Sequence, residues 1–307
     1  EDKTAKFTSS LAESILLYRC FSRMGKKEGA CKRVILWYEN QSLHKAIIAG
    51  VRSVFPDVRI IGAQLFIHRP NLLNLFPLTS EVKKSLIPDV LLATSLNQCE
   101  VATSFVRSLP CRPAAALRYS YLFDPDKFSK LDSNNKQSMI LVILPFDITE
   151  AVELLQYITD ALSNIRDDVW VYIKCHQDYT LEQLKKEVGS KQWPDRFKIY
   201  NGSLTDVLNK TTVIISSNSG AIIEALVRGV PVIIMRRQTT LNQNIILDFK
   251  MDVITQCFCT AELIEAINKY ISVDSLQVIL YRKLGEQIRE KYFTMTNTET
   301  LLPFLKN

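Results

Sequence analysis

The sequence predicts an α/β protein with two doubly wound domains, each a parallel sheet covered by helices. Short strand-like apolar runs alternate with segments of helical periodicity along most of the 307 residues, which is the pattern of parallel α/β sheets. The length suits two domains of ordinary size. A polar segment rich in turn formers interrupts the alternation at 124–138. We therefore predict an N-terminal domain over 1–125, a linker at 124–138 and a C-terminal domain over 139–307.

The N-terminal domain is predicted from helical spacing in 9–23 and from the strands that follow. Ser42 is a candidate N-cap, and Pro110 is expected to stop the last helix. The predicted elements are a helix at 9–23, a strand at 34–38, a helix at 42–54, strands at 59–63 and 90–93, a helix at 98–108 and a short aromatic strand at 119–123. Because the chain starts without Met and runs directly into a helical pattern, we expect an excised segment whose N-terminal domain is incomplete.

The C-terminal domain shows a stricter alternation, which predicts a doubly wound sheet. Short loops after parallel strands are where such folds place their ligands. The predicted elements are strands at 139–144, 169–174, 197–200, 212–216, 231–235 and 252–255, and helices at 148–163, 180–188, 203–209, 220–228, 260–271 and 274–292.

The composition is that of a soluble globular protein, with 47% hydrophobic and 23% charged residues. Its longest apolar runs, such as 230–235, are far shorter than the roughly 20 residues that span a bilayer. The polar start at Glu1 lacks the apolar stretch of a signal peptide. Seven cysteines occur without a Cys-x-x-Cys pair or a Cys/His ligand spacing, which predicts reduced thiols in a cytoplasmic protein and no metal site.

The positive charge is concentrated in the first part of the chain. Residues 1–135 contain 19 Lys and Arg against 12 Asp and Glu, and the remainder contains 19 against 20. A basic half can face an acidic sugar, an anionic membrane surface or nucleic acid. No RNA-binding signature with interleaved aromatic residues is present, so we predict no nucleic-acid partner.

The strongest local motif lies where the strand at 212–216 ends and the next helix begins. Small residues fill this junction: Ser216, Ser217, Ser219 and Gly220. The N–H groups of a first helical turn can bind a phosphate, and small side chains let it approach. Glu224, one turn further, could accept from ribose hydroxyls. The same pattern also fits an ordinary capped junction without a ligand.

The segment from Ile214 to Ile233 resembles the S-x-S-G/A-x-x-E-A-x-x-x-G-x-P-V-I segment of GT-B glycosyltransferases. The strand ending in Lys174-Cys175-His176 is similar to the Lys-x-His-Pro strand of many of them, including bacterial enzymes that use CMP-Kdo or CMP-nonulosonate donors. Gln177 replaces the proline here. Trp37 to Gln41 and Ala116 to Tyr119 resemble Y-E-N-Q and E-A-L-R-Y segments of a bacterial O-antigen and capsule biosynthesis family. In the second segment Ala115 stands where an acid is common.

This resemblance covers about residues 34–235 and implies a GT-B fold with two Rossmann-like domains. It implies a nucleotide sugar bound by the C-terminal domain and a glycan or lipid-linked glycan acceptor bound by the N-terminal one. The resemblance implies a metal-independent enzyme, so no cofactor or metal is expected. We predict a cytoplasmic transferase, and leave open its peripheral association with the inner face of the membrane.

Inverting transfer needs a base that deprotonates the acceptor hydroxyl. Glu39, just after the first strand, is the first candidate, and His68 is the second. Each has a structural reading as well: Glu39 could cap the next helix, and His68 could be an unpaired loop residue. Arg69, Arg118 and Arg236 are the predicted contacts for phosphate or for an acceptor carboxylate.

The donor site is predicted to use two further groups. His176 could meet a phosphate, and the turn at Asn201 and Gly202 could contact the base through its backbone, although a bare turn has the same sequence. The predicted donor-binding set is His176, Asn201, Gly202, Ser216, Ser217, Ser219, Gly220 and Glu224. Two rival functions stay open, a non-hydrolysing sugar-nucleotide epimerase and a non-catalytic binding or scaffold module.

Overall fold

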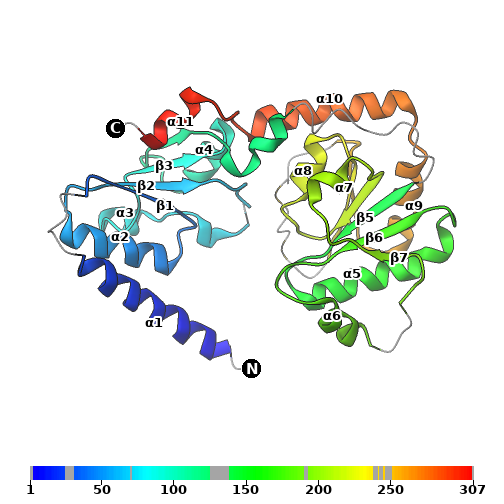
Figure 1. Cartoon of the computed structure of the whole chain (residues 1–307), viewed down its shortest axis with the longest axis horizontal. Coiled ribbons are helices and arrows are strands. Elements are labelled where there is room, and N and C mark those ends of the chain that lie inside the picture. The colour runs from blue at the N-terminus through cyan, green and yellow to red at the C-terminus, as the bar shows by residue number, and fades with distance from the viewer. Residues whose placement is uncertain are drawn as a thin grey trace. The chain divides into compact units, whose positions relative to one another are not determined.

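The structure is a computed structural model, and it divides the chain into two compact units (Figure 1). It describes residues 3–24, 31–69, 71–124, 138–189, 193–237, 241, 245 and 251–305, with side chains from Ser10 onward. Unit 1 comprises Glu1–Ser120 and Glu290–Asn307, and unit 2 comprises Tyr121–Arg289.

The division differs from the predicted one at the C-terminal end of the chain. Residues 290–307, which the sequence prediction assigned to the C-terminal domain, pack within unit 1. The chain therefore passes between the units twice, near Ser120 and again near Arg289. Of the predicted linker, residues 125–137 lie outside the described part of the chain.

Unit 1 is built on a parallel sheet in the order β1-β2-β3-β4. The pairing places Trp37 opposite Ala63, and Gln64 opposite Ala93. Its elements are α1 (Lys3–Ser22), β1 (Arg33–Trp37), α2 (Ser42–Val54), β2 (Arg59–Gln64), the 3-10 helix η2 (Leu73–Leu75), α3 (Thr79–Lys83), β3 (Val90–Ala93), α4 (Leu96–Ala102), β4 (Cys111–Pro113), the 3-10 helix η3 (Leu117–Phe123), which runs across the boundary, and α11 (Thr298–Leu305).

The two faces of this sheet bury different sets of side chains. Alternate strand residues point to opposite faces, so Ile60 and Ile61 belong to separate clusters. One cluster includes Ile48 of α2 and Ala102 of α4, and the other includes Phe304 of α11. Helices from two distant parts of the chain thus cover the two faces.

Backbone hydrogen bonds hold the returning C-terminal segment to unit 1. Thr294 N donates to Thr94 O at 2.6 Å, and Ala115 N donates to Thr300 O at 2.9 Å. The Arg33 guanidinium donates to the carbonyl of Leu305 at 2.5 Å. These bonds satisfy backbone groups that would otherwise be unpaired inside the unit.

Unit 2 is a six-stranded parallel sheet in the order β10-β9-β8-β5-β6-β7. The order reverses between β5 and β8, so the carboxyl ends of these two strands flank a topological switch point. Its elements are β5 (Met139–Ile143), α5 (Ile148–Ala161), the 3-10 helix η5 (Leu162–Asn164), β6 (Trp170–Lys174), α6 (Leu181–Val188), β7 (Phe197–Ile199), α7 (Leu204–Leu208), β8 (Val213–Ser216), α8 (Ile222–Val227), β9 (Val232–Met235), β10 (Ile254–Cys257), α9 (Thr260–Ile271) and α10 (Ser275–Tyr292), which continues into unit 1.

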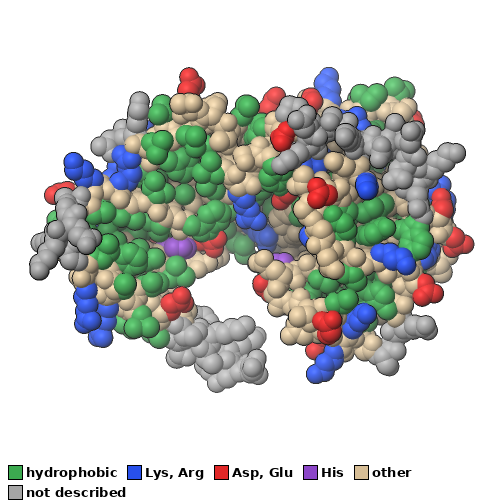
Figure 2. Space-filling model, viewed as in Figure 1, with side chains coloured by type: hydrophobic (Ala, Val, Ile, Leu, Met, Phe, Trp, Pro, Cys, Tyr) green, Lys and Arg blue, Asp and Glu red, His purple; other side chains and the backbone are tan. Residues whose placement is uncertain are grey.

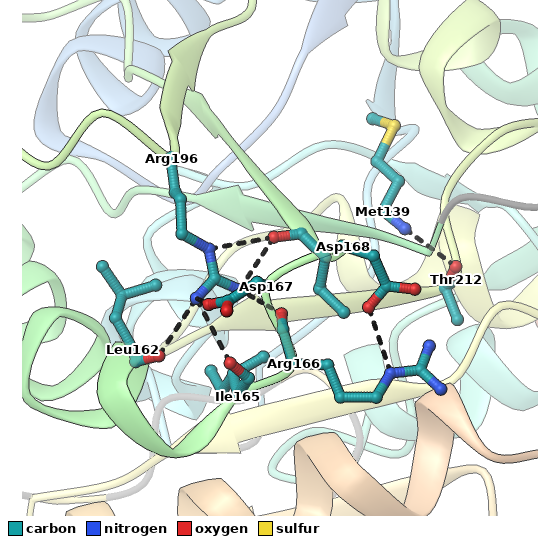
Figure 3. A network of polar contacts seen from close by, with 9 residues as sticks. Met139, Leu162, Ile165, Arg166, Asp167, Asp168, Arg196 and Thr212 are labelled. Carbon is teal, nitrogen blue, oxygen red and sulfur yellow. Dashed lines mark hydrogen bonds and ion pairs between the residues drawn. The ribbon is translucent and has the colours of Figure 1, made fainter.

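Arg196 ties together the amino edge of this sheet, opposite the switch point (Figure 3). Its guanidinium donates to the carbonyls of Leu162, Ile165 and Val169 at 3.1, 3.2 and 2.9 Å. The loop between α5 and β6 is thereby held by one side chain. Doubly wound folds bind their ligands at the other edge of the sheet, where the carboxyl ends of the strands lie. We therefore look for a ligand site there.

Two glycines allow α10 to pack closely on the turn between α8 and β9. Gly229 has a φ of +72°, and a Cβ there would lie 2.7 Å from Arg282 N. A Cβ on Gly285 would lie 2.5 Å from Val227 O. Real Cβ atoms do not approach backbone this closely, so both positions need glycine.

Most predicted elements are present, but several boundaries were wrong. Gln41 rather than Ser42 precedes α2 as its N-cap. The helix predicted at 98–108 is α4, which ends at Ala102, where the Thr103 hydroxyl donates to Cys99 O at 2.9 Å. The predicted strand at 119–123 is the 3-10 helix η3. The strand predicted at 252–255 is β10, two residues later, and α3, β4 and α11 were not predicted.

Candidate functional site

The switch point of unit 2 is bordered by two loops that follow β5 and β8. The first contains Phe146 and Asp147, and the second contains Ser217 and Asn218. Asn218 Nδ2 donates to Glu150 Oε2 at 2.9 Å, which links the second loop to the first turn of α5. The position is the one at which doubly wound sheets bind ligands.

The serines predicted to bind the donor have different surroundings. Ser216 is fully buried, and its hydroxyl donates to Ile143 O at 2.9 Å, so it ties β8 to β5. In this structure the Ser216 hydroxyl is therefore used within the sheet, and its predicted ligand contact stays a prediction. Ser217 Oγ is buried and has no hydrogen-bond partner among the described residues. Ser219 Oγ accepts from Ala221 N at 3.3 Å.

The helix after this loop begins later than the sequence suggested. Helix α8 starts at Ile222 rather than at residue 220 and has six residues. The dipole of a six-residue helix contributes less to anion binding than that of the predicted nine-residue helix. Gly220 precedes it, and a Cβ there would meet only Ile245 Cδ1, at 3.8 Å, among the described atoms. The described residues therefore leave room beside the backbone of this loop.

Glu224 lies in the first turn of α8 and accepts a hydrogen bond from Tyr121 Oη. Tyr121 belongs to η3, where the chain enters unit 2. Both side chains are half-buried. A spacing argument could not identify this tyrosine, because it lies 103 residues earlier in the chain.

His176 follows β6 at the same edge of the sheet. Its Nδ1 accepts from Asp178 N at 3.3 Å, and the Phe146 ring lies 6.5 Å from its own. Phe146 is 54% exposed, and Tyr179 Oη donates to Pro145 O at 2.8 Å beside it. Sequence reasoning missed Phe146, although an aromatic residue directly after a buried strand was a usable signal.

The other predicted contacts in unit 2 are spread along the edge. Asn201 and Gly202 are exposed, and Lys174 Nζ donates to Gly202 O at 2.8 Å. Arg236 follows β9, donates to Gln256 Oε1 at 2.9 Å and lies over the Phe258 ring. Its guanidinium is therefore held toward β10.

In unit 1 the candidate base Glu39 is fixed by its neighbours in the turn after β1. Trp37 Nε1 donates to Glu39 Oε1 at 2.7 Å, and Gln41 Nε2 donates to Oε2 at 2.8 Å. The carboxylate is half-buried. Each oxygen of a carboxylate has two acceptor sites, so both oxygens can still accept from a ligand.

His44 supports the same turn from within α2. Its Nδ1 accepts from Glu39 N and from Gln41 N, both at 3.3 Å. Burial lowers the pKa of His44, and the charge of Glu39 acts in the opposite direction. The neutral ring with its proton on Nε2 is the form that can accept these two bonds.

The second predicted base, His68, is 1% exposed. Its backbone N donates to Gln98 Oε1 at 2.8 Å, and its ring lies between those of Phe66 and Phe76, at 5.0 and 5.9 Å. Burial lowers the pKa of His68 to about 4. The structure places it inside unit 1 and not on a surface open to an acceptor, so it is an interior residue of the unit.

We expect the free energy of unfolding of unit 1 to fall as the pH drops from about 6.5 toward 4. Between the ordinary pKa of 6.5 and the folded value of about 4, the unfolded chain binds a proton at His68 that the folded chain does not, so acid favours unfolding. This difference in pKa corresponds to a change of roughly 3 kcal/mol in the free energy of unfolding. The pKa of His44 is also lowered, so this group too reduces the free energy of unfolding as the pH drops.

The measurement is urea unfolding against pH in a chain with Trp170 and Trp193 replaced by Phe, so that Trp37 alone reports on unit 1. His68→Gln should flatten the pH dependence. An unchanged slope in that variant would contradict the assignment to His68.

The remaining predicted cations of unit 1 are Arg69 and Arg118. Arg69 is half-buried in the loop after β2, and its carbonyl accepts from Leu72 N at 2.9 Å. Arg118 is exposed and lies over the Tyr119 ring at 5.6 Å. Their roles stay predictions.

Within the described ranges, no group of three or more His, Cys, Asp or Glu side chains is arranged to hold a metal ion. Among the same residues, no helix is both long and apolar enough to cross a membrane.

Comparisons of the whole chain identify its fold. No family model matches, and no curated protein matches in sequence. Among solved structures, that of accessory secretory protein 1, 2 and 3 of Streptococcus pneumoniae is similar over 95% of this chain, with a TM-score of 0.54 and 12% identity. The chain spans 56% of that structure's chain.

Two similar structures are of sugar-nucleotide enzymes. The calicheamicin glycosyltransferase CalG4 matches 95% of this chain and 78% of its own, with a TM-score of 0.54 and 13% identity. UDP-GlcNAc 2-epimerase from Neisseria meningitidis, bound to UDP-GlcNAc, matches 95% and 80%, with a TM-score of 0.55 and 12% identity. With its two parallel sheets, this chain therefore has the GT-B fold that glycosyltransferases and sugar-nucleotide epimerases share.

Proposed function

We propose that this protein is a glycosyltransferase whose unit 2 binds a nucleotide-activated sugar. The observation that carries the proposal is the loop Ser217–Gly220 at the switch point. It offers a buried hydroxyl without a described partner, and a Cβ on Gly220 would meet only Ile245 Cδ1 among the described atoms. An unpaired buried hydroxyl costs about 1–3 kcal/mol, which a phosphate oxygen or a water would offset.

The surrounding side chains fit the parts of such a donor. In this proposal His176 would contact a phosphate, and the exposed Phe146 ring, 6.5 Å from the His176 ring, would offer a stacking surface. Glu224 is positioned by Tyr121 and could accept from ribose hydroxyls. The epimerase structure that this fold resembles contains UDP-GlcNAc, which supports a uridine nucleotide, whereas the Lys174-Cys175-His176 strand suggests CMP. Both belong in the test.

Unit 1 supplies the acceptor side in this proposal. Glu39 is the half-buried carboxylate at the carboxyl edge of its sheet, with both oxygens oriented by neutral donors. As general base it would accept the proton of an acceptor hydroxyl as that oxygen attacks the anomeric carbon. A surface glycan or a lipid-linked glycan is the acceptor class that we propose, and the protein would act in the cytoplasm, at or near the membrane face.

The test is a thermal-shift screen with CMP, UDP, GDP, ADP and TDP. A ligand that binds only the native state raises the melting temperature by mass action, by an amount set by its concentration over its Kd. We expect one nucleotide to raise it and Ser219→Trp to abolish the shift. Ser163→Trp, at an exposed site beyond the end of α5, is the matched control and should keep it. If no nucleotide shifts the native protein, the donor site is wrong and a non-catalytic module becomes the better account.

An epimerase is the second candidate, because UDP-GlcNAc 2-epimerase has a similar fold. It would need no acceptor. Incubation with UDP-GlcNAc alone, followed by NMR of the sugar, separates the two: inversion at C2 without added acceptor favours the epimerase, and an unchanged donor favours the transferase.

A further inference from the structure

Trp37 is an exposed aromatic residue that is nevertheless held in one orientation. It ends β1, the edge strand of unit 1, and is 40% exposed. Its indole Nε1 donates to Glu39 Oε1 at 2.7 Å, and its ring lies 5.7 Å from that of Phe66, with 42° between the ring planes. An indole offers a large apolar ring together with one N–H donor, and here the donor is engaged while the ring stays exposed, so the ring is available to a ligand.

The same face of β1 is left open around this ring. Ile35, two residues earlier on that face, is 47% exposed, whereas the opposite face buries Tyr38 in the cluster beneath α2. Helix α11 covers this side of the sheet over Ile61 and Leu92. In Figure 2 apolar side chains occupy much of the viewed face of unit 1.

The turn that holds Glu39 beside the indole is rigid. Asn40 has a φ of 56°, in the left-handed region that asparagine tolerates better than most residues other than glycine. Its side chain accepts from Tyr38 Oη at 2.8 Å and donates to Phe76 O at 2.9 Å. A buried polar network of this kind fixes the backbone, so the indole and the carboxylate keep their relative positions.

We propose that Trp37 and Glu39 form a binding site for one pyranose ring of a glycan. A pyranose has an apolar C–H face that stacks on an aromatic ring and a rim of hydroxyl donors. The indole provides the first contact, and the unoccupied acceptor sites of the Glu39 carboxylate provide the second. The negative charge of Glu39 favours a neutral sugar or an amino sugar over an anionic one. The inference deepens the proposed function, because it rests on the acceptor side of that proposal.

The three tryptophans of the chain allow a direct test. Trp37 lies in unit 1, and Trp170 and Trp193 lie in unit 2. In protein labelled with ¹⁵N-indole tryptophan, each gives one Nε1–H signal, and Trp37→Phe assigns the first. Titration with the methyl glycosides of glucose, galactose, mannose, N-acetylglucosamine and glucosamine should move the Trp37 signal while those of Trp170 and Trp193 stay in place.

Two variants locate the contacts. Trp37→Ala should abolish the saturable binding of the same glycoside, measured by saturation-transfer NMR on the sugar protons. Glu39→Ala should weaken it at least tenfold while keeping the stack. If no glycoside moves the Trp37 signal, the inference is overturned. A signal that moves with protein concentration instead of sugar would show that a second copy covers the face, which also overturns it.

The outcome can be separated from that of the proposed function. If a nucleotide binds unit 2 but no glycoside moves the Trp37 signal, the donor proposal is kept and the pyranose site is rejected. If a glycoside moves the Trp37 signal but no nucleotide raises the melting temperature, the pyranose site is kept and the transferase proposal is rejected.

Discussion

Replacing Gly229 with alanine is expected to destabilise unit 2 by roughly 3 kcal/mol, which for a unit of this size lowers the melting temperature by about 10 °C. Two costs add at this position. The φ of +72° is unfavourable for any residue with a Cβ, and the new methyl group would lie 2.7 Å from Arg282 N, so α10 must move away from the turn.

Two other glycines separate these costs. Gly189 has a φ of +83° and a ψ of −171°, with no described atom within 4 Å of its Cβ position, so Gly189→Ala should cost about 1–3 kcal/mol, from the backbone alone. Gly285→Ala has the steric clash with Val227 O inside a helix, where alanine regains up to about 1 kcal/mol of propensity. We expect Gly229→Ala to lower the free energy of unfolding more than either of these two substitutions, because only Gly229 combines a positive φ with a backbone clash.

The measurement is urea unfolding of the intact chain carrying Trp37→Phe, so that Trp170 and Trp193 report on unit 2. A Gly229 variant no less stable than the Gly189 variant would show that α10 does not press on this turn.

Glu39→Gln is expected to lower the rate of sugar transfer by about 10²–10⁴-fold, the usual contribution of a general base. Glutamine can still accept from Trp37 Nε1 but cannot take a proton, so the turn is largely kept while the chemistry is lost. The bond from Gln41 is the contact that the change removes. The rate is measured as release of the nucleotide that the thermal-shift screen identifies, from sugar donors that carry this nucleotide and with a methyl glycoside as acceptor.

The controls test whether the loss is chemical. Nucleotide binding to unit 2 should be unchanged in Glu39→Gln. Glu100→Gln, on an exposed position of α4, should keep the full rate. A Glu39→Gln rate within threefold of the native one would assign the base to another residue.

The sequence was sufficient for the fold class because local patterns dominate it. Buried parallel strands are short apolar runs, and the strand at Val90–Ala93 was predicted with its observed bounds. Helix α11 was missed because Pro303 lies inside its eight residues, and proline argues against a helix.

The site was only partly predictable, for a different reason. Glu39 and the loop at Ser217 follow strands, which sequence spacing can show. The burial of His68 depends on Gln98, 30 residues later, and the orientation of the Ser216 hydroxyl depends on Ile143, 73 residues earlier. Such partners are set by tertiary packing and not by local pattern.

The two crossings of the chain between the units affect the order in which it can fold on the ribosome. All of unit 2, Tyr121–Arg289, is translated between the two parts of unit 1. Until α11 emerges, the nascent sheet of unit 1 lacks Phe304 over Ile61 and Leu92 and lacks the bonds from Thr294 and Thr300. Unit 2 is a continuous segment and can fold first, whereas the apolar face of unit 1 stays uncovered until α11 is made and is the surface that a chaperone would protect during synthesis.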